Sequence, residues 1–149
     1  MLRIKGNKLS VAGMQYSLPD EFYIDVAGEG VKAPNGLRFV SPQKDYVIEV
    51  QTCSLQYASI EQAIADIFKN DGAFAIIEPV KKYSVNDVTG LSVMYADRKC
   101  EYFEIYFERT GECSDFVVLL ISADKGGIGI REVIERKAVK EFISGFHRI

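Results

Sequence analysis

The sequence has one histidine, three cysteines and no long apolar run. Cys53, Cys100 and Cys113 are odd in number, widely spaced and without a Cys-x-x-Cys pair, which argues against a disulfide scaffold and against a zinc site. Any Ser-His-Asp or Cys-His arrangement would have to use His147, close to the end of the chain. We therefore expect no metal site, no cofactor and no catalytic residue.

No apolar run approaches the roughly 20 residues that cross a bilayer. The first residues also lack the apolar stretch of roughly 7–15 residues that marks a signal peptide. The sequence therefore predicts a cytoplasmic protein without membrane contact. The formal net charge is −3 and the pI is about 5.3. Because this charge repels phosphate backbones, nucleic acid is not an expected partner.

A glycine loop at residues 126–129 lies between an expected strand and an expected helix, where backbone N–H groups can meet a phosphate. The dinucleotide fingerprint needs a third glycine, and Gly127-Ile128-Gly129 is followed by Ile130, Arg131 and Glu132 instead. The Gly-Lys-Ser/Thr ending of a nucleotide-hydrolase loop is absent too. The loop from Gly126 to Gly129 is thus expected to be a connector. A small-molecule-binding or phosphate-binding domain that uses this loop is the alternative.

The composition is that of one globular domain. Apolar residues make up 48% and charged residues 26%, both near globular averages, and 149 residues is a usual domain length. With no repeat and no linker, residues 1–149 are predicted to be a single domain. Runs that alternate polar and apolar residues, separated by turn residues, predict strands. These predicted strands cover residues 9–11, 14–18, 22–26, 37–41, 45–52, 80–85, 90–96, 100–108 and 115–123.

Two helices are predicted. The first covers residues 60–68, after Ser59 as N-cap with Gln62 three residues later, the pattern of a capping box. The second is an amphipathic segment over residues 130–146. We therefore expect an α+β fold, an antiparallel sheet flanked by two main helices in α/β/α layers.

The strand predicted over 100–108 alternates between an apolar and a polar face. Its apolar side chains are expected in the core, beside Leu91, Val93 and Tyr95 across a three-residue connection. On this strand the core face carries Phe103, Ile105 and Phe107, and the polar face carries Tyr102, Glu104, Tyr106 and Glu108. Residues 116–121 are apolar at every position, which predicts a strand in the middle of the sheet.

The polar face of the strand over 100–108 is a candidate recognition surface. Tyr102 and Tyr106, with Glu104 between them and Met94 expected on the same face, offer apolar area with polar tips. We expect these four residues to contact a partner. The alternative is that a helix or a loop covers them.

Three short stretches, YSLPDEF at 16–22, VNDVTGL at 85–91 and EIYF at 104–107, resemble the PsbP-like (Mog-type) superfamily. The order of the expected elements along most of the chain is similar to that superfamily too. The resemblance implies an antiparallel sheet with helices on both sides. It also implies a binding or adaptor role, because members of the superfamily are mostly not enzymes.

The first residues depart from two branches of this superfamily, because they carry neither a lipobox cysteine nor a serine-rich and arginine-rich leader. We therefore expect a non-enzymatic binding or adaptor domain in the cytoplasm, acting through a protein or peptide partner.

Overall fold

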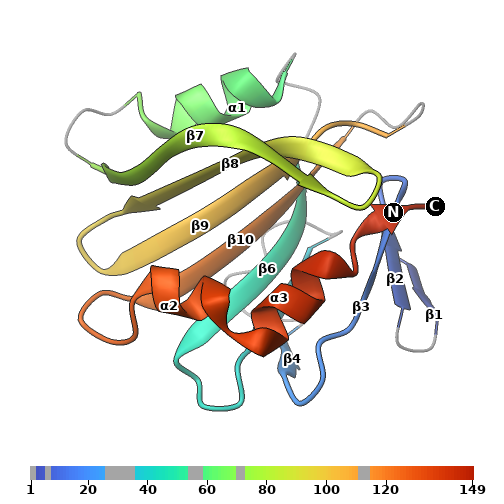
Figure 1. The fold of residues 1–149 in the computed structure, drawn as a ribbon, viewed down its shortest axis with the longest axis horizontal. Helices are drawn as coiled ribbons and strands as arrows, with labels where there is room; N and C mark the ends of the chain where they lie inside the picture. The colour runs from blue at the N-terminus through green and yellow to red at the C-terminus, as the bar shows by residue number, and fades with distance from the viewer. Residues whose placement is uncertain (1–2, 6–7, 26–35, 54–58, 70–72, 111–114) are drawn as a thin grey trace.

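A computed structural model describes residues 3–5, 8–25, 36–53, 59–69, 73–110 and 115–149 (Figure 1). The described residues form eleven strands and three helices. The strands are β1 (Arg3–Lys5), β2 (Lys8–Val11), β3 (Met14–Ser17), β4 (Tyr23–Asp25), β5 (Leu37–Val40), β6 (Tyr46–Cys53), β7 (Ala75–Val85), β8 (Val88–Ala96), β9 (Cys100–Phe107), β10 (Phe116–Asp124) and β11 (His147–Arg148). The helices are α1 (Ile60–Ile67), α2 (Ile130–Glu135) and α3 (Lys137–Ser144). None of these helices is long and apolar enough to cross a membrane.

The strands form two sheets in which every described pair is antiparallel. The larger sheet has seven strands in the order β4-β5-β6-β10-β9-β8-β7, and the smaller has four in the order β1-β2-β3-β11. The predicted antiparallel pairing is therefore confirmed. So is the central place of the apolar run at 116–121, because β10 lies in the middle of the seven strands.

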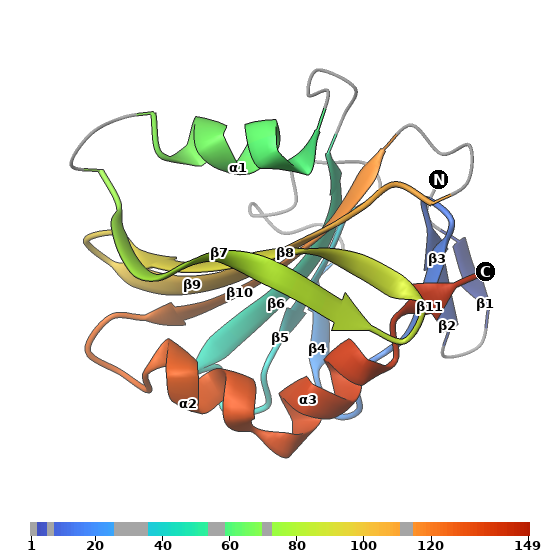
Figure 2. The same ribbon diagram turned by 45° about the horizontal axis from the view of Figure 1, so that its top comes forward.

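The predicted α+β class, with two main helices flanking one sheet in α/β/α layers, is wrong. The chain is mostly β, with two sheets and helices of only six to eight residues. An eight-residue helix is about 12 Å long, whereas seven strands span roughly 30 Å. Figure 2 shows α1 on one face of the larger sheet and α2 with α3 on the other, each over part of its width. Each helix covers only part of a sheet face, so the helices do not form complete layers (Figure 2).

The second predicted helix, over 130–146, is broken in the structure. Arg136 has φ −64° and ψ 139°, an extended conformation that ends α2 and precedes α3. Neither glycine nor proline marks this position, so the break comes from tertiary contacts of Arg136, which are described below. The first helix agrees with its prediction at its start, since the Ser59 side chain accepts a hydrogen bond from the N–H of Gln62 at 3.2 Å.

Three residues, 97–99, connect β8 to β9 as predicted, but the first paired residues are Ala96 and Glu101, so four residues lie between paired positions. Asp97 shapes the turn, because its Oδ1 accepts two backbone N–H groups within the turn at 2.8 Å each. Since side chains alternate along a strand, one added residue reverses the face. Tyr95 therefore pairs with Tyr102 on the polar face of β9, and its predicted place in the core beside Phe103 is wrong.

The two sheets share one hydrophobic core. The hairpin β2–β3 turns at Ala12 and Gly13, both with positive φ, as the sequence predicted for a tight turn. Its apolar side chains belong to the same buried cluster as those of β5, β6, β9, β10 and α3. The hairpin members of this cluster are Leu9, Val11, Met14 and Tyr16.

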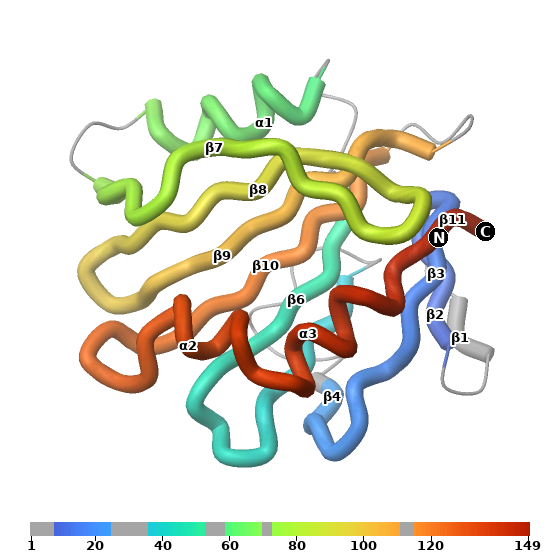
Figure 3. Tube along the Cα trace, viewed as in Figure 1, coloured from blue at the N-terminus to red at the C-terminus, as the bar shows by residue number. Residues whose placement is uncertain are grey.

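The β7–β8 hairpin tip holds the C-terminal segment in place, and Figure 3 shows the tip beside β11. Asn86 donates from Nδ2 to the carbonyl oxygens of Ser144 at 2.7 Å and Phe146 at 2.6 Å. Asp87 accepts the N–H of Arg148 through Oδ1 at 2.8 Å. Asn86 has φ +51°, a conformation that asparagine and glycine adopt most readily. One residue thus forms the turn and satisfies the end of α3.

We expect Asn86→Gly to lower the free energy of unfolding by about 1–2 kcal/mol, because it removes both hydrogen bonds and keeps the backbone conformation. Asn86→Ala should cost about 1 kcal/mol more, because alanine pays for the positive φ. Urea denaturation of the two variants separates these contributions. An Asn86→Gly protein as stable as the unsubstituted chain would show that the two bonds contribute nothing.

Candidate functional site

The four residues predicted to bind a partner do not form one surface. Tyr102, Glu104 and Tyr106 lie on the sheet face that α1 covers, and Glu104 and Tyr106 are only 6% and 7% exposed. Met94 pairs with Phe103 and is 1% exposed in the core on the opposite face, so its predicted position is wrong. The alternative of a covering helix is the one the structure shows.

Glu104 is buried under α1, although the sequence predicted a solvated carboxylate. The Tyr95 hydroxyl donates to its Oε1, and Oε2 has no hydrogen-bond partner among the described residues. Burial raises the pKa of Glu104, and the nearby Glu49 raises it further, while hydrogen bonds from Tyr95 and Tyr106 lower it in part. The net shift is upward and favours the neutral acid.

Glu49 on β6 lies on the same face, two strands from Glu104 with Leu120 of β10 between them. Arg38 approaches Glu49 to 3.5 Å between Nε and Oε1, and Gln51 donates to its Oε2 at 2.9 Å. Burial raises the pKa of Glu49, and Arg38 and Gln51 lower it in part. Two strand spacings separate the two acids by roughly 10 Å at their Cα atoms. Two carboxyl groups with raised pKa on one face occur at acid–base sites, but here the apolar residue Leu120 lies between them in the sheet.

His147 and Cys100, the other candidates for chemistry, have structural partners. The His147 ring nitrogens lie 2.9 Å from the carbonyl oxygen of Gly145 and 3.1 Å from Oε1 of Gln15. The Cys100 thiol lies 3.7 Å from Oδ1 of Asp124, and burial together with the nearby carboxylates raises its pKa. A raised pKa keeps the thiol protonated and unreactive. Cys113 lies outside the described residues.

The glycine loop joins β10 to α2 through a turn in which Gly126 has φ +91° and the Gly127 N–H donates to the Asp124 carbonyl at 3.1 Å. At the start of α2, the N–H of Ile130 donates to Oε1 of Glu101 at 3.1 Å. A phosphate at this helix end would have to displace a carboxylate of the protein itself. The arrangement fits a connector and disfavours the phosphate alternative.

A groove lies between β7 and the α2–α3 segment, with a volume of about 300 Å³. We call it the β7–α3 groove. Charged side chains stand along it in pairs, Lys140 with Glu135 at 2.6 Å and Lys81 with Glu78 at 3.5 Å. Its apolar lining comes from β7, β9, α2 and α3, and consists of Tyr83, Val85, Phe103, Ile134 and Ile143. A concave apolar surface with a charged border can accept an apolar side chain of a partner.

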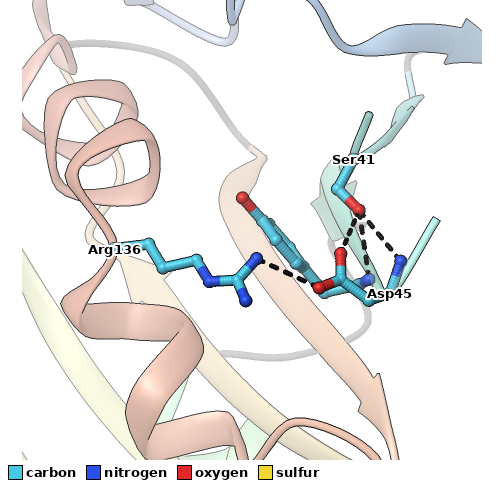
Figure 4. Close-up of polar contacts among 4 residues, drawn as sticks. Ser41, Asp45 and Arg136 are labelled. Atoms are coloured by element: carbon cyan, nitrogen blue, oxygen red, sulfur yellow. Dashed lines mark hydrogen bonds and ion pairs between the residues drawn. The ribbon is translucent and has the colours of Figure 1, made fainter. Parts of the chain in front are cut away.

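Arg136, between α2 and α3, anchors the two helices that form one side of this groove. Figure 4 shows its side chain reaching from the α2–α3 junction to the turn between β5 and β6. Its Nη1 donates to Oδ2 of Asp45 at 3.0 Å, and its guanidinium lies 5.4 Å from the centre of the Tyr46 ring. The Ser41 hydroxyl donates to Oδ1 of Asp45 at 2.7 Å and accepts the N–H groups of Asp45 and Tyr46. These contacts explain the helix break at Arg136.

A second hollow, of about 450 Å³, lies beside this arginine. Phe22 and Tyr46 line it in an edge-to-face contact at 5.7 Å, with Glu21 and Lys137 among the charged residues. Arg136 pairs with Asp45 and lies against the Tyr46 ring, so its charge in this hollow is already balanced by the carboxylate of Asp45. The β7–α3 groove has five apolar lining residues against four in this hollow, and it is the stronger candidate site.

Sequence reasoning missed the groove because its lining comes from segments far apart in the sequence. Residues 75–79, the first part of β7, were not predicted as a strand, since Pro79 interrupts the alternating pattern. The signals that were present are the apolar residues Tyr83 and Val85 on β7 and Ile134 and Ile143 on the amphipathic C-terminal segment. Nothing in the sequence shows that these two sets face one another.

No protein-family model matches the chain, and no curated protein matches it. Among solved structures, a crystal structure of a protein from Bacteroides thetaiotaomicron VPI-5482 is similar, with a TM-score of 0.52 and 14% sequence identity. The match covers 98% of this chain and 49% of that chain, so the chain spans about half the length of this structural neighbour. At this identity the similarity concerns the fold alone, and the resemblance to the PsbP-like superfamily stays a prediction.

Proposed function

We propose that the chain is a non-enzymatic binding or adaptor domain of the cytoplasm that takes an apolar segment of a protein or peptide partner in the β7–α3 groove. The observation that carries this proposal is the groove itself, an apolar lining of five side chains bordered by charges of both signs. Partner contact surfaces have this composition, with an apolar centre and a polar rim. The balanced rim charges favour a partner segment that also carries both signs.

The edge strand beside the groove supports a macromolecular partner. β7 is one of the two edge strands of the larger sheet, and its Ile76 and Val80 are 56% and 44% exposed. Neither residue lines the groove, so a small molecule bound there would leave both exposed. A protein segment that covers the edge would bury them, and exposed apolar side chains on an edge strand are a known contact feature.

The shape of β7 favours docking by side chains over extension of the sheet. Its pairing with β8 shifts register between Ile76 and Glu78 and again between Glu78 and Lys81, and Pro79 lies within this stretch. Such irregularities and the lysines at 81 and 82 hinder a further strand from pairing along the edge. The raised pKa of the Cys100 thiol and the two ring contacts of His147 support a non-enzymatic role.

The test is a selection of peptides from a displayed random library on the immobilised chain, followed by affinity measurements with three variants. Ile134→Ser alters the groove, and Ile76→Ser alters the edge strand. Ile24→Ser is the matched control, because Ile24 is 48% exposed on β4 at the opposite edge of the same sheet. We expect Ile134→Ser to weaken binding about tenfold or more, Ile76→Ser to weaken it a few-fold, and Ile24→Ser to leave it unchanged.

Methyl resonances of the unsubstituted chain locate the bound peptide without any substitution. We expect shifts at Val85, Ile134 and Ile143 on titration, and constant positions at Ile60 and Ile64 of α1. Shifts confined to α1, or a library that yields no binding peptide, would contradict the proposal.

A further inference from the structure

The structure contains an ionisable group beneath α1 that the proposed function does not use. Glu104 lies within the sheet face that α1 covers, and its Oε2 has no hydrogen-bond partner among the described residues, so the bonds from Tyr95 and Tyr106 satisfy the carboxyl group only in part. The side chains that α1 buries on this face are Ile60, Ala63 and Ile64, all apolar. A buried carboxylate with one oxygen unpaired is costly, whereas a neutral acid in the same place is tolerated.

We infer that α1 is a pH-sensitive cover of the sheet, docked while Glu104 is neutral and loosened when Glu104 is charged. The charged group needs water at Oε2, and displacement of α1 admits water from this side. The strands around Glu104 are held by ladder hydrogen bonds on both sides, because β9 pairs with β8 and β10. α1 is held on this face by side-chain packing, so its opening is the least costly response.

Among the residues that the structure describes, the groups around Glu104 supply no compensating positive charge. On β8 and β9, Tyr95, Tyr102 and Tyr106 surround the acid, and burial raises the pKa of Tyr95 and Tyr102, which keeps their hydroxyls neutral. On β6, Glu49 adds negative charge, and Arg38 of β5 approaches Glu49 at 3.5 Å. β10 contributes Leu120 and α1 contributes apolar residues, while Glu61 of α1 is exposed and Asp66 pairs with Lys69 at 2.7 Å.

The direction of the pH effect follows from burial. The pKa of Glu104 is raised in the docked state above its ordinary value of 4.5, so docked α1 retains a proton that the undocked state releases. The contribution of neutral Glu104 to docking is therefore fully present below pH 4.5 and is lost as the pH rises through the pKa of the docked state. Undocking also unwinds α1, because an isolated helix of eight residues is not stable in water.

Amide hydrogen exchange by NMR tests the inference in the complete chain between pH 5 and pH 8.5. Protection factors of the α1 amides at 64–67 should fall about tenfold or more over this range, because a charged Glu104 favours the open state in which these amides exchange. The amides of Leu119 and Ile121 in the central strand β10 serve as the internal reference and should keep their protection. Glu104→Gln should abolish the pH dependence in α1, because the amide stays neutral and still accepts from Tyr95.

Glu108→Gln is the matched control, because Glu108 is an exposed acid that follows directly after β9. It should reproduce the pH dependence of the unsubstituted chain. Protection in α1 that does not change with pH, or that falls equally in Glu104→Gln, overturns the inference. So does a parallel fall at Leu119 and Ile121, which would report global unfolding. A carboxyl ¹³C titration of Glu104 with a midpoint at or below its ordinary value of 4.5 would overturn it independently.

Discussion

Gly90→Ala should lower the free energy of unfolding by at least about 3 kcal/mol, the largest effect we expect from a single methyl group in this chain. Gly90 lies in β8 opposite Phe107 of β9. A Cβ atom at this position would lie 2.0 Å from the carbonyl oxygen of Tyr106 and 2.9 Å from the Cα of Phe107. Both contacts are with backbone, so no side-chain rotation relieves them. The strands must separate locally, and the ladder beside the core breaks.

Gly127→Ala is the matched control for this prediction. A Cβ atom on Gly127 would meet the Asp124 carbonyl oxygen at 3.4 Å, an ordinary contact, so the expected change is within about 0.5 kcal/mol. Urea denaturation of both variants gives the comparison. A Gly90→Ala protein within about 1 kcal/mol of the unsubstituted chain would mean that β8 and β9 are farther apart at this position than the structure has them.

The sequence predicted those elements that depend on interactions between residues close together in the chain. Ser59 caps α1 because a hydroxyl and a backbone N–H three residues apart suffice for an N-cap. The Ala12-Gly13 turn needs only residues that tolerate positive φ. The run at 116–121 indicated the centre of the sheet because burial on both faces requires apolar residues at every position. In each case the determining interactions lie within a few residues.

Features that depend on distant contacts were not predictable in this way. β11 has two residues and exists through pairing with Gln15 and Met14 of β3. The break at Arg136 depends on Asp45, which lies 91 positions away in the chain. Glu104 followed a polar alternation that is typical of a solvated face, yet it is buried on the sheet face that α1 covers. Alternation of polar and apolar residues along a strand indicates which face is polar, but it does not show whether another element covers that face.

The candidate site depends most strongly on distant contacts. The β7–α3 groove combines an edge strand, a side chain of β9 and two helices that follow only after β10. Its position depends on α3, which is held at its start by Arg136 and at its end by Asn86. Both anchors connect segments of the larger sheet to the C-terminal part of the chain. The site is thus a product of how the sheets and α3 pack together.

The two sheets pack together through an aromatic cluster around Phe146, which is fully buried. Its ring stacks on Tyr16 of the smaller sheet at 4.8 Å and on Phe107 of the larger sheet at 5.4 Å. Phe142 of α3 meets the same ring edge-to-face at 5.5 Å. One side chain therefore contacts both sheets and a helix. If residues 1–149 are a single domain, this cluster is where the two sheets become one cooperative unit.

Phe146→Ala should lower the free energy of unfolding by about 3–5 kcal/mol, because it removes a buried aromatic ring and leaves a cavity between rigid neighbours. Phe146→Leu, which keeps most of the volume and loses the stacking, should cost about 1–2 kcal/mol. Denaturation followed by far-ultraviolet circular dichroism and by tyrosine fluorescence should give one coincident transition for the unsubstituted chain and for both variants. The fluorescence signal includes Tyr16 of the smaller sheet as well as the tyrosines elsewhere in the chain. If Phe146→Ala instead releases the smaller sheet in a separate earlier transition and leaves the larger sheet at its original stability, the two sheets are independent units, and the single-domain prediction is wrong.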